Sequence, residues 1–340
     1  MGYKKGSLSP VELPTYCPPG IPRVFDDVSF ALSMGLRNQT VWWLICKTTL
    51  HDFTKGTGTY DVFTIPKKRG GLRTIHAPKR TLKRVQKVLL RTYFDPLPAG
   101  DWVGAYVLGR DMVYSVNKHT GKDVVISLDL RDFFGATKRS WVQEWIRSLG
   151  YPPEVSRVMA GLVTVPVPST RGVRYCVPQG APTSGAVTNH VASARLDLPL
   201  LAFLESRGLA DCAYTRYADD LTISFNGFLP VDEFRELMSG ISEVVRQSGY
   251  RLKAKKTRVA VSRPSKPVAQ QMLGMTINEK ANVPRHKRLE LRQRVHRVIW
   301  GLPNRELQTD RLRAELRYWV RIAPMTIQPL IDRLDGAPHD

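Results

Sequence analysis

The chain has 340 residues and a strong excess of positive charge, with 51 Lys and Arg against 30 Asp and Glu and a formal net charge of +21. This excess indicates a polyanionic partner such as nucleic acid. Residues 1–20 lack the apolar core of a signal peptide, no apolar run approaches the roughly 18 residues of a membrane span, and the four cysteines lack paired metal-ligand spacing. These features exclude secreted and membrane-spanning classes and predict a protein of the reducing cytoplasm that has no membrane partner.

The first part of the chain predicts an extended arm, then helices, then a hairpin turn. Residues 7–22 are rich in Pro and Gly, which favours an extended arm. The apolar cluster Trp42–Cys46 is typical of the core of a helical hairpin. Further along, Gly70 and Gly71 stand together, and such a pair indicates a β-hairpin turn.

A buried strand that ends in an acid is predicted at residues 123–130. The run Val124–Leu128 is almost wholly apolar, and Asp129 follows it. An acid at the tip of such a strand can face other acids across a small sheet. Asp132 lies close by in sequence, and we expect it to be a helix cap or a surface acid, since Asp favours such positions.

A Pro- and Gly-rich loop that leads into a helix is predicted at residues 176–185. The loop contains Gln179, which offers donor and acceptor groups, and Gly180, which lets a backbone approach a ligand closely. A nucleotide-binding loop and an ordinary capped helix start fit this segment about equally well. The apolar periodic positions of the following helix are Val187, Val191, Ala194 and Leu196.

Two adjacent acids, Asp219 and Asp220, stand between strand-forming runs at residues 213–225. This pattern predicts a β-hairpin whose tight turn carries both carboxylates. Like charges side by side repel each other, so a cation is expected there. An exposed turn with two solvated acids is the alternative, but Asp129 upstream favours a metal site. Three carboxylates can hold two Mg²⁺ ions about 4 Å apart, which clamp the attacking and leaving oxygens of a phosphoryl transfer.

The positive charge gathers in three stretches of the chain. Residues 67–94 contain ten Lys and Arg and no acid, residues 246–266 contain eight and no acid, and residues 285–321 contain eleven with four acids. Apolar periodicity runs through these stretches, so they are predicted to be faces of folded helices and not disordered tails. Cationic helix faces beside an acidic metal site suit an RNA–DNA duplex held by its phosphates.

Three segments taken together resemble motifs A, B and C of reverse transcriptases. They are Asp129 with Phe133-Phe134, then Val177-Pro178-Gln179-Gly180, then Tyr217-Ala218-Asp219-Asp220, and they occur in the family's order. Residues 178–184 and 214–224 are closely similar to the retron branch of bacterial reverse transcriptases. The resemblance runs from about Val24 to the C-terminal helices, and as a set the motifs are highly specific.

The resemblance implies an α+β right-hand polymerase fold. The chain would comprise an N-terminal arm and helical extension (1–56), fingers (57–122), a palm with the catalytic acids (123–270) and a helical thumb (271–340). By resemblance, the catalytic acids are Asp129, Asp219 and Asp220, and Leu130 joins them as a ligand of the two Mg²⁺ ions. Phe134 matches the bulky gate that excludes a ribose 2′-OH. Residues expected to bind the deoxynucleoside triphosphate are Lys67, Lys68, Arg73, Phe134, Gln179, Gly180 and Lys256.

Two segments that the family links to recognition of its own RNA are altered in this chain. The usual Asn-Ala-x-x-His reads Ser115–His119, and the usual Val-Thr-Gly reads Met272–Gly274, so only the His and the Gly are kept. These departures leave membership of the retron branch open. A thumb helix that begins at Pro284 is expected to follow the duplex minor groove. Residues expected to bind nucleic acid are His119, Gly274, Arg285, Lys287, Arg288, Arg292, Arg294, Arg313 and Arg317.

Three functions fit the sequence. The first is a retron-like reverse transcriptase that uses deoxynucleoside triphosphates to copy part of a dedicated structured non-coding RNA into short single-stranded DNA (msDNA), with an RNA–DNA hybrid as product, in an anti-phage defence system. The chain leaves no room for a fused effector, so a separate effector protein is expected as a partner. The second is another bacterial defence-associated or group II intron-like reverse transcriptase. The third is a catalytically retired RNA-binding scaffold, against which the three acids argue.

Overall fold

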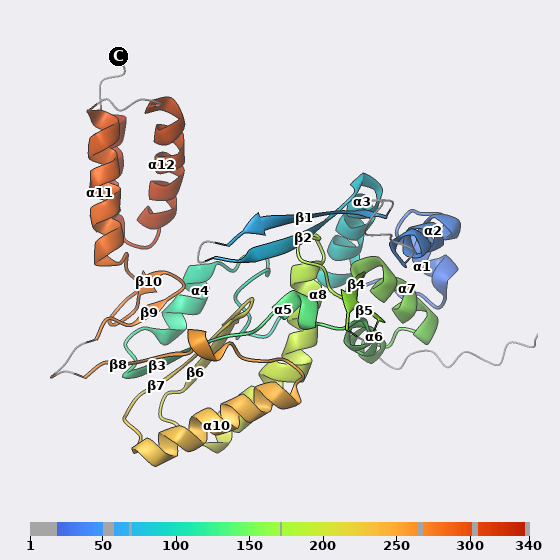
Figure 1. The fold of residues 1–340 in the computed structure, drawn as a ribbon, viewed down its shortest axis with the longest axis horizontal. Coiled ribbons are helices and arrows are strands. Elements are labelled where there is room, and N and C mark those ends of the chain that lie inside the picture. Colours follow the sequence, from blue (N-terminus) through green and yellow to red (C-terminus); the bar gives the residue numbers. More distant parts are fainter. Residues whose placement is uncertain are drawn as a thin grey trace, which may run out of the picture.

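The structure is a computed structural model and describes residues 19–49, 58–67, 70–170, 172–263, 265, 268–300 and 305–336. Helices and antiparallel strands are mixed along the chain, which confirms the predicted α+β class (Figure 1). Among the described residues, no helix has both the length and the apolar character needed to cross a membrane. Cys46, Cys176 and Cys212 are free thiols.

A four-stranded antiparallel sheet with the order β6-β7-β3-β8 carries the predicted acids. Side chains alternate across β3, so Ile126 and Leu128 enter the main core while Val125 enters a second core on the opposite face. The expected strand at 123–130 and the expected hairpin at 213–225 are both confirmed. The strands are β3 Val124–Asp129, β6 Ala213–Tyr217, β7 Asp220–Phe225 and β8 Arg258–Val261.

Three helices contribute buried side chains to the main core on one side of this sheet. The helix predicted after the Pro- and Gly-rich loop is confirmed as α8, and a π-helical turn joins it to α9. Ala194 lies in this turn and is exposed, contrary to the predicted apolar periodicity, because a π-helical turn shifts the side-chain phase. The elements are α8 Ser184–Ala192, the π-helical turn Ser193–Asp197, α9 Leu198–Ser206 and α10 Val231–Gln247.

The N-terminal helices pack on the same core. Asp26 begins α1 with a capping box, because its Oδ1 accepts a hydrogen bond from the Ser29 amide at 2.7 Å. The Trp42–Cys46 cluster was expected in the core, but α2 buries only Leu44 and Ile45 of the five residues and turns both tryptophans outward. The helices of this region are α1 Asp27–Ser33, α2 Asn38–Thr49, α3 Arg80–Leu89 with the π-helical turn Leu90–Phe94, α6 Arg139–Ser148 and α7 Pro153–Val163.

Two β-hairpins lie beside these helices. The first has its strands in register from Tyr60 opposite Pro78 to Pro66 opposite Leu72, and Gly70 and Gly71 of its turn both have positive φ, as the sequence predicted. The second hairpin joins the end of α7 to the loop that precedes α8. The strands are β1 Tyr60–Pro66, β2 Leu72–Pro78, β4 Val165–Ser169 and β5 Gly172–Cys176.

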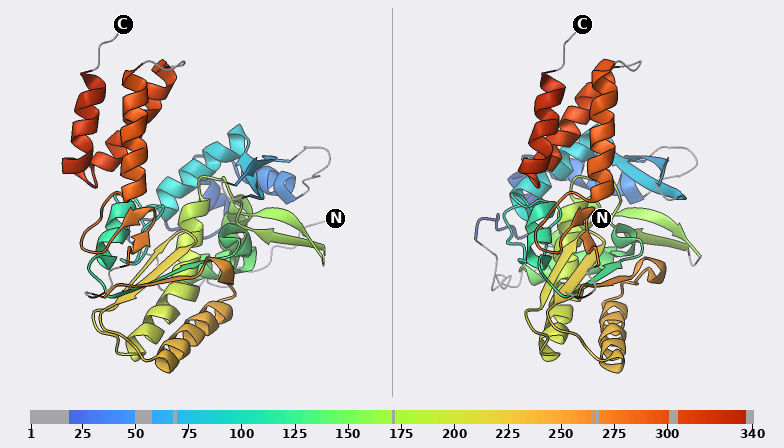
Figure 2. Two further views of the ribbon diagram at one scale, coloured as in Figure 1. Left: turned by 60° about the vertical axis from the view of Figure 1, so that its left-hand side comes forward. Right: turned by 90° about the vertical axis from the view of Figure 1, so that its left-hand side faces the viewer.

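The C-terminal helices stand together at one end of the molecule, above the small strands β9 and β10 (Figure 2). They form the second core with Val125 of the central sheet and with Val116. Pro284 occupies the position just before α11 and so precedes the helix by one residue. The elements are β9 Gln271–Met272, β10 Met275–Thr276, α11 Arg285–Ile299, α12 Arg305–Val320 and α13 Pro324–Asp335, and the remaining short helices are α4 Met112–Val116, α5 Phe133–Ala136 and the 3₁₀ turns Asn117–His119 and Ala254–Lys256.

Candidate active site

The turn between β6 and β7 presents the two adjacent acids. Tyr217 pairs with Asp220, which leaves Ala218 and Asp219 as the two residues of the turn. Ala218 has a φ of 56°, a conformation that type II′ hairpin turns require at this position and that glycine usually supplies. A residue other than glycine in this region carries backbone strain, which is typical of functional turns.

The third acid lies directly across the sheet from this turn. Asp129 is the last residue of β3 and stands opposite Asp220 in the β3–β7 register. The Leu130 amide donates a hydrogen bond to the carbonyl of Asp219 at 2.8 Å, which fixes the turn to the end of β3. Backbone pairing thus brings Asp129, Asp219 and Asp220 to one end of the sheet, as the sequence predicted.

The charges of these acids act on one another. Partial burial, followed by the charges of Asp219 and Asp129, raises the pKa of Asp220 to about 6. Two ammonium groups oppose this repulsion. Lys253 Nζ lies 2.5 Å from Asp129 Oδ1, and Lys256 donates a hydrogen bond to Asp129 Oδ2. Contact with Asp129 raises the pKa of Lys256.

The donor chemistry of this site fits a divalent cation. Carboxylate oxygens are the ligands that hard cations prefer, and three carboxylates, those of Asp129, Asp219 and Asp220, stand at this end of the sheet. As the side chains stand, however, no group of three or more His, Cys, Asp or Glu within the described residues is close enough to hold a metal ion. Both Asp129 oxygens face lysines instead.

A cavity of about 400 Å³ lies between the β1–β2 hairpin, the second hairpin and the loop before α8. Lys67, Arg73 and Gln179 line it, so the structure brings these three predicted nucleotide-binding residues together. Lys68 lies outside the described residues. Asp132 also lines the cavity, and its carboxylate lies 3.4 Å from Arg174. It is exposed as expected, but it makes no side-chain hydrogen bond that caps α5.

Gly180 brings the loop before α8 against strand β2. Its φ is +117°, and an added Cβ would lie 2.9 Å from Ile75 Cγ2 and 3.2 Å from the His76 carbonyl oxygen. The neighbouring Gln179 carbonyl accepts a hydrogen bond from the His76 amide at 2.8 Å. Glycine is therefore required here for the contact between the loop and the hairpin.

Phe134 lies five residues after Asp129 and is partly buried. Its ring packs against Phe133, with ring centres 5.6 Å apart, and edge-on against Tyr106, with ring centres 6.0 Å apart. Sequence reasoning did not select Tyr106. Its positive φ of 57° and its exposed position beside Phe134 distinguish it in the structure.

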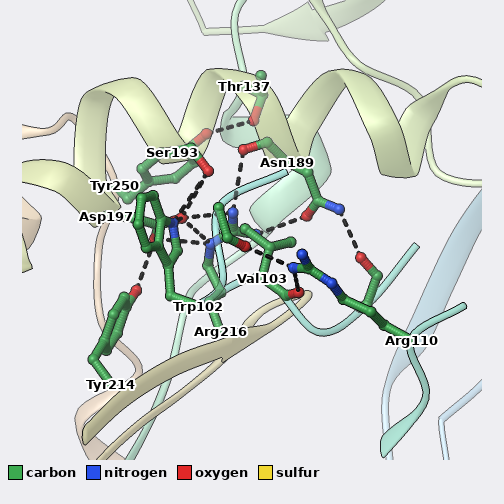
Figure 3. Close-up of polar contacts among 12 residues, drawn as sticks. Trp102, Val103, Arg110, Thr137, Asn189, Ser193, Asp197, Tyr214, Arg216 and Tyr250 are labelled. Atoms are coloured by element: carbon green, nitrogen blue, oxygen red, sulfur yellow. Dashed lines mark hydrogen bonds and ion pairs between the residues drawn. The ribbon is translucent and has the colours of Figure 1, made fainter. Parts of the chain in front are cut away.

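A buried ion pair beneath the acid-bearing turn was also missed (Figure 3). Arg216 and Asp197 are fully buried, and Arg216 Nη2 lies 2.7 Å from Asp197 Oδ2. Burial favours a lower pKa for Arg216, but the charge and hydrogen bonds of Asp197 outweigh it, so the pKa is raised. Asp197 also accepts hydrogen bonds from Tyr214 at 2.7 Å and Trp102 at 3.0 Å. This network anchors β6 three residues before Asp219.

His119 was expected to contact nucleic acid, and the structure corrects this. The side chain is fully buried. Its Nδ1 lies 2.7 Å from Ser224 Oγ, and its Nε2 lies 2.8 Å from Thr215 Oγ1. Burial, with smaller effects from Lys122 and Lys118, lowers the pKa of His119 to about 3. A neutral imidazole therefore ties the face of β6 and β7 together and has no polar atom left for RNA.

The predicted duplex-binding residues divide into paired and unpaired groups. Lys287 and Arg294 both contact Glu315, which joins α11 to α12, and Arg313 Nε lies 2.9 Å from Asp335 Oδ1 of α13. These three side chains join the helices through ion pairs, and their contact with phosphates stays a prediction. Gly274 has a φ of +83° in the exposed β9–β10 turn. Within the described chain, no ion pair engages the remaining residues Arg285, Arg288, Arg292 and Arg317.

Comparison with known proteins gives consistent matches. The family model "Reverse transcriptase (RNA-dependent DNA polymerase)" matches residues 65–277. The chain is 33% identical over 294 residues to the Retron Mx65 reverse transcriptase of Myxococcus xanthus, covering 82% of this chain and 64% of that protein. It is 31% identical over 312 residues to the Retron Mx162 reverse transcriptase of the same organism, covering 84% and 61%. It is 30% identical over 245 residues to the Retron Ec86 reverse transcriptase of Escherichia coli, covering 71% of each. The chain thus spans a little under two thirds of the length of the two Myxococcus proteins.

Proposed function

Because the chain belongs to the reverse transcriptase family and is of the retron type, we propose that it is an RNA-directed DNA polymerase. The observation that carries this proposal is the pairing of Asp129 with Asp220 beside Asp219 at one end of the sheet. In the proposed division, residues 57–122 are the fingers, residues 123–270 the palm and residues 271–340 the thumb, after an N-terminal extension. The separate C-terminal core supports a boundary near residue 271.

The proposed cofactor is Mg²⁺, held as two ions by Asp129, Leu130, Asp219 and Asp220. When bound, the ions supply Lewis-acid stabilisation to the attacking and leaving oxygens of phosphoryl transfer. The contribution of the chain is to hold the acids together through the β3–β7 pairing. Lys253 and Lys256 neutralise Asp129 as the side chains stand, so cation binding requires that they release it. Lys256 is then placed beside the site, where it can contact a triphosphate.

The cavity beside the β1–β2 hairpin is proposed to receive the incoming deoxynucleoside triphosphate. Lys67 and Arg73 supply positive charge to it, and arginine can bind phosphate through two parallel hydrogen bonds. Gln179 offers both donor and acceptor groups to the nucleotide. Gly180 brings this loop to the hairpin, and Phe134 is the proposed gate against a ribose 2′-OH. Lys68 is proposed to act with Lys67.

The proposed nucleic-acid surface is the exposed face of α11. Arg285, Arg288 and Arg292 recur three or four residues apart along one side of the helix, next to the stripe that buries Leu291 and Val295. These arginines, which make no ion pair with another described residue, can contact the phosphates of an RNA–DNA hybrid. Arg317 of α12 and the turn at Gly274 are proposed to extend this surface.

The retron type suggests a more specific role. We propose that the protein copies part of a dedicated structured non-coding RNA into msDNA, acts in the cytoplasm in anti-phage defence, and works with a separate effector protein. The similarity of the chain to retron reverse transcriptases supports a role of the retron type.

The test of polymerase activity is primer extension on an RNA template with Mg²⁺. Asp219→Asn is expected to abolish DNA synthesis, because it removes charge where the transition state must be stabilised. Binding of the template should persist, measured by a shift in electrophoretic mobility. Asp232→Asn is the matched control, because Asp232 is an exposed acid on α10. Near-normal extension by Asp219→Asn would contradict the assignment.

A further inference from the structure

A loop at residues 99–110 crosses the edge of the central sheet beside the acid-bearing turn. The Arg216 amide donates a hydrogen bond to the Trp102 carbonyl at 2.7 Å, and the Gly104 amide donates one to the Arg216 carbonyl at 2.9 Å. Val103 lies between these contacts and forms a parallel bridge with Arg216. The loop is therefore fixed to β6 three residues before Asp219.

The side chains of Arg110, which is partly buried, and Asn189, which is buried, fix the loop further (Figure 3). The Arg110 guanidinium donates hydrogen bonds to the carbonyls of Gly100 at 2.7 Å and Val103 at 2.8 Å. Asn189 Nδ2 donates to the Ala105 carbonyl at 2.7 Å, and Asn189 Oδ1 accepts from Arg216 Nη1 at 2.8 Å. These contacts set the backbone immediately before the next residue, Tyr106.

The backbone of Tyr106 has an unusual, left-handed conformation, although the loop that precedes it is well anchored. Its φ is 57°, and 57% of its surface is exposed. A left-handed backbone costs a residue with a side chain on the order of 1 kcal/mol, and such strain is typical of functional positions. The ring lies against Gly185, where an added Cβ would come within 2.4 Å of Tyr106 Cγ. The first turn of α8 thus leaves room for this ring.

The surroundings of Tyr106 connect three parts of the site. Its ring packs edge-on against Phe134, with ring centres 6.0 Å apart. The charges that act on its hydroxyl include those of Asp219 on the turn and Arg73 on β2: burial and then Asp219 raise the pKa of Tyr106, while Arg73 lowers it. The side chain therefore packs on the proposed sugar gate and lies within electrostatic range of Asp219 on the acid-bearing turn and of Arg73 on β2.

We infer that Tyr106 is a positioning residue for sugar selection, which holds the Phe134 ring in the place where it blocks a ribose 2′-OH. This inference rests on the proposed polymerase function. Phe134 is only partly buried, so loss of the neighbouring ring would free its side chain to rotate toward another staggered conformation. The space opened by such a rotation would admit a ribonucleotide.

The test compares incorporation of one deoxyribonucleotide with that of the matching ribonucleotide on a primed RNA template. Tyr106→Ala should raise kcat/KM for the ribonucleotide relative to the deoxyribonucleotide by about 3- to 10-fold, the range expected for loss of an aromatic pair. Tyr106→Phe keeps the ring and should leave the ratio unchanged. Leu108→Ala is a control in the same loop, because Leu108 is 80% exposed.

Gly185→Ala separates this role from a general effect on folding. The added methyl group would lie 2.4 Å from Tyr106 Cγ and 2.7 Å from its Cβ, so the ring must move together with the start of its side chain. Some loss of stability is expected from this shift, so discrimination is measured well below the melting temperature of the variant. Under that condition the folded variant should still lose sugar discrimination. A structural role alone would predict that discrimination changes only when stability falls.

The outcomes distinguish the inference from the proposed function. A parent protein that does not extend a primer would overturn both. A parent that polymerises and discriminates, while Tyr106→Ala and Gly185→Ala keep its ratio, would overturn the inference alone. Because Tyr106 acts through Phe134, the double variant Tyr106→Ala with Phe134→Ala should be no less selective than Phe134→Ala. A further loss in the double variant would contradict action through Phe134.

Discussion

The buried pair of Arg216 and Asp197 gives a prediction about stability that can be worked out from the structure. Asp197→Asn keeps the size of the side chain but removes its charge. Both partners are fully buried, and Asp197 accepts hydrogen bonds from Arg216, Tyr214 and Trp102. The variant leaves the Arg216 charge buried without a counter-charge, which costs about 3–5 kcal/mol.

Thermal unfolding followed by circular dichroism measures this cost. At about 2 °C per kcal/mol, the rate for longer chains, the melting temperature should fall by roughly 6–10 °C. The matched control is Asp232→Asn, which breaks a 3.0 Å ion pair with Arg235 on the surface, where the two side chains are 89% and 74% exposed. Its effect should stay within about 0.5 kcal/mol, because exposed pairs contribute little.

A double variant tests whether the uncompensated charge is the cause. Asp197→Leu with Arg216→Met removes both charges and should unfold at a higher temperature than Asp197→Asn, because well-packed apolar residues can replace a buried pair at little cost. The reasoning would be refuted if Asp197→Asn melted within 2 °C of the parent. It would also be refuted if the double variant were no more stable than the single variant.

Two further predictions concern charge. The pKa of Asp220 is raised to about 6, so its contribution to stability is present below its unfolded pKa near 4 and is lost as the pH rises through 6. Asp220→Asn should therefore melt at a higher temperature than the parent at pH 8 in EDTA, with the difference vanishing near pH 4; an equal difference at both pH values would contradict this. For nucleic acid, Arg288→Gln with Arg292→Gln should make the negative slope of log K against log salt less steep by about 2. The slope is measured by fluorescence anisotropy with an RNA–DNA hybrid. Lys287→Gln with Arg294→Gln should change this slope by less, because both cations are engaged with Glu315. Equal changes in slope for the two double variants would refute the difference between the two sets of cations.

Local patterns predicted the elements that carry the site. The alternation on both sides of Asp219 and Asp220 predicted the hairpin, and the apolar run before Asp129 predicted the buried strand. These predictions succeeded because each depends on residues close together in sequence. The approach of the loop before α8 to β2 was not predicted, because the contact of Gly180 with Ile75 and His76 joins segments about a hundred residues apart.

The ion pairs of three C-terminal cations and the burial of His119 were not predicted, for one reason. Lys287, Arg294 and Arg313 appeared in sequence as cations on a helix, but their acidic partners Glu315 and Asp335 come from other helices. The burial of His119 depends likewise on the hydroxyl groups of two strands about a hundred residues away. The periodicity of one element shows which face it buries. It does not show which side chains of a second element will meet a charge on the first.

For the same reason, the sequence did not predict how the acids of the hairpin turn relate to the buried pair of Arg216 and Asp197. The acids Asp129, Asp219 and Asp220 repel one another at the end of the sheet, and this repulsion would drive the turn away from β3. Three residues before Asp219, the same strand is anchored by Arg216 through a fully buried and compensated pair. A rigid anchor beside a repulsive end holds the acids together without requiring them to be neutralised by protons. A cation bound as proposed would relieve this repulsion once Lys253 and Lys256 release Asp129, and the backbone of the hairpin is already in place for it.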